Sequence, residues 1–132
     1  MKKIGLILTL LLLTGCLGET GKGYITKQCN KTENINGMKK ETKIKIKSKQ
    51  GTVEEIIIKE TYDENMDLES IKDSKKSEQN SYKNIKIEFD KNVFTYILDI
   101  EKLNEDEKGK YNIKDEQHKQ IKQYEQDGYT CK

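Results

Sequence analysis

The side chains of this sequence that could take part in covalent or acid–base chemistry are three cysteines, one histidine and 23 acidic residues. Cys16 follows an apolar run, whereas Cys29 and Cys131 stand near the two ends of the remaining chain. His118 is the only histidine, and no serine lies in a Gly-x-Ser-x-Gly sequence. A nucleophilic triad or a zinc site needs more histidine and cysteine than this. We therefore predict no catalytic, cofactor-binding or metal site.

The N-terminal segment has the pattern of a secretory signal. Two lysines, Lys2 and Lys3, precede an apolar run over residues 4–13. A helix needs about 20 apolar residues to span a bilayer, so this run is too short for a transmembrane anchor. Its end, Leu13-Thr14-Gly15-Cys16, resembles the lipobox of bacterial lipoproteins, in which an aliphatic residue, a small residue and Gly or Ala precede the cysteine.

This resemblance implies that residues 1–15 are a lipoprotein signal peptide and that Cys16 becomes a lipidated N-terminus. One acyl chain gives only reversible membrane binding, whereas two give stable anchoring. We therefore predict lipidation of Cys16, which holds the protein on the outer face of the cytoplasmic membrane. The alternative is an ordinary secretory signal with an unmodified Cys16. Residues 16–23 are rich in glycine and predict a flexible tether.

The other two cysteines form an even pair once Cys16 is committed to lipid. Exported proteins retain disulfides, so we predict a bond between Cys29 and Cys131. Such a bond closes almost the whole domain, and the chain-entropy model assigns about 4.7 kcal/mol to a loop of about 100 residues. The rival interpretation, a redox-active thiol pair, lacks the Cys-x-x-Cys spacing.

The charge balance gives no support to a nucleic-acid partner. Removal of residues 1–15 leaves 132 − 15 = 117 residues, with 25 − 2 = 23 lysines against 23 acidic residues. A nucleic-acid-binding domain is expected to show a basic excess. Alternating lysines over residues 43–49 are interpreted as the solvated face of a strand. We predict one domain, residues 24–132, that binds no nucleic acid.

Hydrophobic periodicity predicts strands in the first half of this domain. Residues 24–32, 39–48 and 52–62 have strand character and are separated by turn signals, which predicts a three-stranded antiparallel meander. In the second strand, alternate residues form one uncharged face, which we expect to be buried: Thr42, Ile44, Ile46 and Ser48. A weakly amphipathic helix is predicted to begin near Asp67.

The second half of the domain predicts a hairpin and a terminal helix. Residues 85–89 and 93–101 alternate around a turn, and residues 104–110 are expected to be a charged loop. Asn112 is the expected N-cap of the last helix, and Gly128 suits its left-handed end. The order β-β-β-α-β-β-α predicts an α+β fold, an antiparallel sheet of about five strands with helices packed on one face.

With this order, the chain resembles small bacterial lipoproteins of the YehR-like family. The resemblance rests on the lipobox, on the short strands, on the segments YKNIKIEF and YILDIEKLN, and on a terminal helix ending in EQDGYTCK. It covers most of the domain. It implies a membrane-anchored α+β domain and no particular activity.

Two groups of carboxylates are candidate sites. Residues 63–67 imitate the start of a calcium loop, but Leu68 stands where glycine is required and Ser74 where a bidentate glutamate is required. Glu101 and Asp106 are candidates for the paired carboxylates of a hydrolase.

The leading hypothesis is a non-catalytic binding or interaction domain at the cell envelope. Its partners would be the membrane, through the lipid, and an envelope protein or ligand of unknown identity. The alternatives are an envelope hydrolase that uses Glu101 and Asp106, and an accessory lipoprotein of a transporter.

Overall fold

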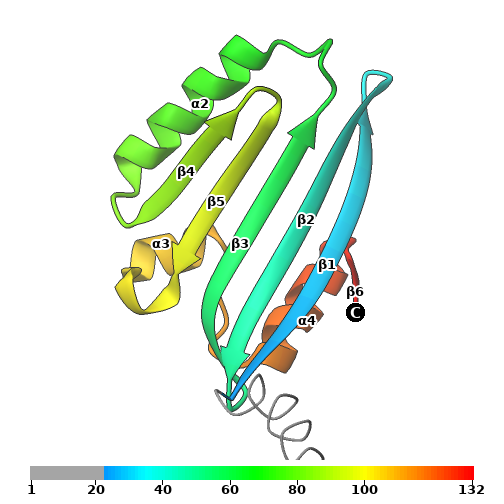
Figure 1. The fold of residues 1–132 in the computed structure, drawn as a ribbon. Coiled ribbons are helices and arrows are strands. Elements are labelled where there is room, and N and C mark those ends of the chain that lie inside the picture. The colour runs from blue at the N-terminus through cyan, green and yellow to red at the C-terminus, as the bar shows by residue number, and fades with distance from the viewer. Residues whose placement is uncertain (1–22) are drawn as a thin grey trace, which may run out of the picture.

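The computed structural model describes residues 23–132, which form a six-stranded antiparallel sheet with helices packed on it (Figure 1). The predicted signal peptide, Cys16 and the tether up to residue 22 lie outside the described residues. Within residues 23–132, no helix is long and apolar enough to span a bilayer.

The strands divide into a meander and a hairpin. The order across the sheet is β4-β5-β3-β2-β1-β6, with every neighbouring pair antiparallel. This arrangement confirms the predicted α+β class and the order of the elements. In chain order they are β1 (Tyr24–Ile35), β2 (Met38–Lys49), β3 (Thr52–Tyr62), α2 (Leu68–Ser81), β4 (Ile85–Asp90), β5 (Val93–Asp99), a 3₁₀ turn η1 (Ile100–Lys102), α3 (Glu105–Lys110), α4 (Gln117–Gln126) and β6 (Thr130–Cys131).

Two tight turns explain why the meander has long, regular strands. Asn36 and Gly37 have φ values of 53° and 82°, and Gln50 and Gly51 have values of 52° and 81°. Two-residue connections with positive φ at both positions match the right-handed twist of the strands they join. The chain therefore reverses directly from β1 to β2 and from β2 to β3.

The sheet buries one face. Thr42, Ile44, Ile46 and Ser48 of β2 are all buried, as predicted, and the lysines between them point to the other side. Apolar residues of β3, β4 and β5 complete the same buried face. Helix α4 lies behind the sheet in Figure 1, and its Tyr124 joins the core. We call the opposite side of the sheet the open face.

The predicted loop over residues 104–110 is wrong, because α3 occupies this segment. Asn104 caps the helix: its side chain accepts a hydrogen bond from the backbone N–H of Glu107, and the Glu107 side chain accepts one from the backbone N–H of Asn104. This reciprocal pair is a capping box, which satisfies two of the free donors at a helix start. A short, highly charged helix thereby forms.

The last helix begins later than predicted. Glu116 is the N-cap of α4, whereas Asn112 has a left-handed φ of 52° in the preceding loop. The end of the helix agrees with the prediction, since Gly128 follows the C-cap Asp127 with a φ of 98°. The chain then returns as β6, which brings the sheet from the predicted five strands to six.

The predicted disulfide between Cys29 and Cys131 is confirmed. The two residues are Cα partners across β1 and β6, with an S–S distance of 2.03 Å and a sequence separation of 102 residues. Backbone hydrogen bonds between Gln28 and Lys132, in both directions, hold the tail beside β1. Cys29 is fully buried, so the bond belongs to the core.

We expect Cys131→Ser to lower the free energy of unfolding by about 2–5 kcal/mol, because the open chain gains conformational freedom when unfolded. Urea unfolding with and without a reductant measures the loss, and reduction of the native protein should reproduce it. Cys16→Ser is the matched control, since it keeps the disulfide. An unchanged midpoint in Cys131→Ser would show that the bond does not stabilise the fold.

Candidate functional site

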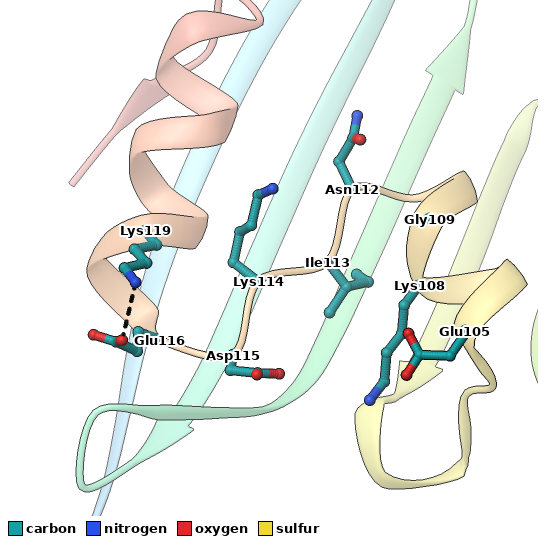
Figure 2. A pocket seen from close by; sticks show the side chains of 9 residues that line it. All are labelled: Glu105, Lys108, Gly109, Asn112, Ile113, Lys114, Asp115, Glu116 and Lys119. Carbon is teal, nitrogen blue, oxygen red and sulfur yellow. Dashed lines mark ion pairs between the residues drawn. The ribbon is translucent and has the colours of Figure 1, made fainter.

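A surface groove runs between α3 and α4, and we call it the α3–α4 groove (Figure 2). It has a volume of about 490 Å³. The connecting loop, residues 111–116, forms its floor. Its lining residues are Glu105, Lys108, Gly109, Asn112, Ile113, Lys114, Asp115, Glu116 and Lys119.

Buried Gln120 fixes the loop that forms the groove. Its side-chain oxygen accepts a hydrogen bond from the backbone N–H of Lys114 at 2.6 Å, and its amide nitrogen donates to the carbonyl of Asn112 at 3.2 Å. The loop is also joined to the start of β3: the Val53 N–H donates to the Asp115 carbonyl at 2.8 Å. The loop that lines the groove is therefore held by hydrogen bonds at Asn112, Lys114 and Asp115.

The groove contains equal numbers of positive and negative side chains. Its lysines are Lys108, Lys114 and Lys119, and its acids are Glu105, Asp115 and Glu116. One pair is closed, with Lys119 Nζ 3.2 Å from Glu116 Oε2. Ile113 is the main apolar residue in the lining. Such a lining can bind a polar or zwitterionic group, but it supplies no activated nucleophile.

The buried side chain of Glu107 joins α3 to the segment before β4. The side chain is 1% exposed, and its carboxylate accepts hydrogen bonds from the backbone N–H of Asn84 (2.9 Å), the side-chain amide of Asn84 (3.0 Å) and the backbone N–H of Asn104 (2.9 Å). Burial by itself would raise the pKa of Glu107. The three hydrogen bonds outweigh burial and hold the pKa below its usual range.

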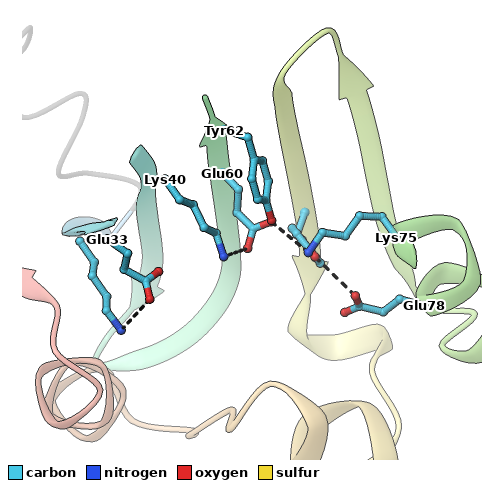
Figure 3. A network of polar contacts seen from close by, with 8 residues as sticks. Glu33, Lys40, Glu60, Tyr62, Lys75 and Glu78 are labelled. Carbon is cyan, nitrogen blue, oxygen red and sulfur yellow. Dashed lines mark hydrogen bonds and ion pairs between the residues drawn. The ribbon is translucent and has the colours of Figure 1, made fainter. Parts of the chain in front are cut away.

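A second polar cluster lies on the helix-bearing side of the sheet, and we call it the Glu60 network (Figure 3). Lys75 of α2 and Lys40 of β2 lie 3.0 and 3.4 Å from the two oxygens of Glu60. The Tyr62 hydroxyl donates to Glu60 Oε1 at 2.9 Å. These side chains are little exposed, at 14% for Lys75 and 12% for Glu60.

Helix α2 is joined to the rest of the domain through this network and through Glu78. The Tyr111 hydroxyl donates to Glu78 Oε2, and the Tyr96 hydroxyl lies 3.4 Å from Oε1. Burial, followed by the nearby carboxylates, raises the pKa of both tyrosines. The tyrosines therefore remain protonated donors. Helix α2 has no fully buried residue, so these polar contacts contribute to holding it against the sheet.

Glu101 and Asp106, the candidate carboxylates of a hydrolase, lie on different elements. Glu101 belongs to η1 and Asp106 to α3, and both are exposed. Glu101 lines a surface hollow with Asp99 and Asp115, but Asp106 is not part of that lining. The described residues bring these two carboxylates to no common enclosed site.

The other acidic and histidine candidates have local structural roles. Asp63 accepts a hydrogen bond from the Asn65 N–H, and Asp67 caps α2 by accepting one from the Ser70 N–H. Within residues 23–132, no group of three or more His, Cys, Asp or Glu side chains could hold a metal. His118 is exposed on α4, with Nδ1 3.6 Å from Glu116.

Sequence reasoning missed Glu107 and the Glu60 network for different reasons. The spacing of Asn104 and Glu107 fits a capping box and could have revealed α3. No local pattern identifies Glu60, because Lys40 and Lys75 reach it from two distant elements.

We expect Glu107→Gln to lower the free energy of unfolding by about 1–3 kcal/mol, because an amide cannot accept all three buried hydrogen bonds. The native carboxylate has a lowered pKa. Its stabilisation is therefore complete above the unfolded pKa of about 4.3 and is lost as pH falls through the folded value. The stability difference between wild type and Glu107→Gln should shrink over that range. Exposed Glu105→Gln is the control in chemical unfolding as a function of pH.

We expect Glu60→Gln to destabilise the domain by about 1–3 kcal/mol, since it leaves Lys40 and Lys75 little exposed without their shared carboxylate. Glu88→Gln removes an exposed partner of Lys86 and should change stability by less than about 0.5 kcal/mol. Thermal unfolding compares the two variants. Equal effects would mean that the Glu60 network contributes no more to the free energy of unfolding than a surface ion pair does.

Comparison with known proteins gives no family for this chain: no family model, no curated protein and no solved structure matches it.

Proposed function

We propose that the chain is a membrane-anchored bacterial lipoprotein whose folded part is a non-catalytic binding domain at the cell envelope. The disulfide carries this proposal. The bond between Cys29 and Cys131 occupies two of the three cysteines and leaves Cys16 as the single thiol available for another role. Cys16 ends an apolar signal-like run, where lipoproteins are acylated.

The disulfide also supports export. Disulfides persist in oxidising compartments and are rare in the reducing cytosol. Export is the condition under which the lipobox-like sequence Leu13-Thr14-Gly15-Cys16 would be used. The two features are far apart in the sequence and independent in their chemistry, and both favour a location outside the cytoplasmic membrane.

Binding is favoured over catalysis by how the polar residues are used. Glu107, Gln120 and Glu60 are committed to hydrogen bonds or ion pairs that hold the fold together. The α3–α4 groove is open and has a mixed charge, which suits recognition of a polar group. These features support an interaction domain whose partner is an envelope protein or ligand.

We expect protein extracted from membranes to begin at Cys16 and to carry acyl mass, and to gain two hydrogens on reduction of the Cys29–Cys131 bond. Intact-mass measurement tests both points at once. Cys16→Ser should lack the acyl mass because an alcohol does not replace the thiol in lipidation. Cys131→Ser is the control, since it should keep the lipid and lose only the mass change on reduction.

An unmodified species in the soluble fraction would contradict the lipoprotein assignment. The binding role is tested separately by crosslinking in cells, with the Cys16→Ser chain as the control for location. Turnover of a cell-wall substrate that is lost in a Glu101→Gln, Asp106→Asn double variant would favour a hydrolase. Specific crosslinking to a transport protein would favour an accessory role.

A further inference from the structure

The two faces of the sheet differ in how closely their central lysines are paired with carboxylates. On the helix-bearing face, Lys40 and Lys75 share the carboxylate of Glu60. On the open face, Lys45 and Lys59 are exposed and have no acidic partner within 4 Å among residues 23–132. The lysine excess of the meander is therefore presented on the side that no helix covers.

Three of these lysines are brought together by the register of β2 and β3. Lys43 lies directly opposite Lys59, and Lys45, opposite Ile57, is diagonal to Lys59. Like charges directly opposite each other destabilise a sheet. A hollow of about 260 Å³ is lined by Gln28, Lys43, Ile44, Lys45, Ile57 and Lys59. We call these three lysines the lysine patch.

The acidic residues of the open face do not neutralise this patch. Glu41 lies 4.0 Å from Lys43, but both side chains are well exposed, so the pair is weak. Glu55 lies opposite Lys47, further along β2. Apart from the Lys43–Lys59 pair, the residues directly opposite the patch on neighbouring strands are uncharged: Gln28, Asn30, Ile57 and Thr95. Glu88 and Asp90 of β4 line a hollow with Lys59, but neither forms an ion pair with it, and Glu88 is paired with Lys86.

The first strand begins on the open face, close in sequence to the predicted lipid anchor. Tyr24 begins β1 on the open face, and the ammonium groups of Lys47 and Lys49 lie 4.4 and 5.6 Å from its ring centroid. Tyr24 stands eight positions after Cys16 in the sequence, which limits the distance between them to at most about 29 Å. Tyrosine is enriched at membrane interfaces, where its ring lies between apolar and aqueous regions.

We propose that the open face lies against anionic lipid headgroups, with Lys43, Lys45 and Lys59 as the main contacts. This inference rests on the proposed lipid anchor, which confines the domain next to the bilayer. The zero net charge of the mature chain does not oppose it, because charges more than about 8 Å away are screened at physiological salt. The local charge around the lysine patch, and not the net charge of the chain, therefore decides how this face interacts with the membrane.

The test is amine acetylation of the lipidated chain in vesicles of phosphatidylcholine, with or without phosphatidylglycerol. Acetylation of Lys43, Lys45 and Lys59 should be slower by about fivefold on the anionic vesicles, the factor expected when one lysine meets an anionic surface. Lys76 and Lys122, exposed on α2 and α4, should react equally on both. The protection should disappear at about 0.5 M salt, where screening is stronger.

A matched pair of variants tests the patch itself. Lys47 lies on the same face of β2 and should also be protected on anionic vesicles in the wild-type chain. In the variant Lys43→Gln, Lys45→Gln, Lys59→Gln, it should lose that protection. It should keep that protection in the control Lys76→Gln, Lys83→Gln, Lys122→Gln, which removes the same charge from exposed positions outside the open face. Equal behaviour of the two triple variants would overturn the proposal.

The outcomes separate this inference from the proposed anchor. Incorporation into neutral vesicles reports on the lipid alone, whereas charge-dependent protection reports on the open face. If the chain carries no lipid, the same acetylation experiment with the free chain and anionic vesicles still tests the face. Equal acetylation on both vesicle types overturns the proposal. Protection in intact cells but not on anionic vesicles also overturns it and indicates that another polyanion covers the face.

Discussion

Burial of only one face of the sheet is the constraint on which the remaining features depend. The core consists of alternate residues from β2, β3, β4 and β5, and the helices complete it from the same side. A polar side chain on that side is stabilised by a partner, because an unsatisfied buried group is costly. Among the described residues, the hydroxyls of Ser48 and Tyr124 are buried without one. A polar side chain on the open face is solvated and needs none.

This constraint explains the different roles of chemically similar residues. Glu60 is little exposed and has two lysine partners, whereas Glu88 is exposed and has one weakly placed partner. Glu107 is buried and accepts three hydrogen bonds, while Glu105, two residues earlier, is exposed and lines the α3–α4 groove. The carboxylates of Glu60 and Glu107, which are little exposed, hold helices α2 and α3 to the rest of the domain. The exposed charged side chains remain accessible to a partner.

The disulfide connects this architecture to the location of the protein. It joins the tail after α4 to the first strand, so the terminal helix is held on the sheet by a covalent bond as well as by Tyr124. The same strand begins at Tyr24, where the predicted tether enters. The strand that carries the disulfide is therefore also the first strand after the proposed anchor in the sequence.

The sequence by itself determined the meander, the hairpin, the pairing of Cys29 with Cys131 and the buried face of β2, because each follows from local periodicity or cysteine count. It also contained the capping box of Asn104 and Glu107, although the six polar residues and one glycine over residues 104–110 suggest a loop. Only the tertiary structure decided that Glu60 meets Lys40 and Lys75 and that Lys43 stands opposite Lys59. Those contacts depend on strand register and helix placement, which join residues far apart in the chain and leave no local pattern.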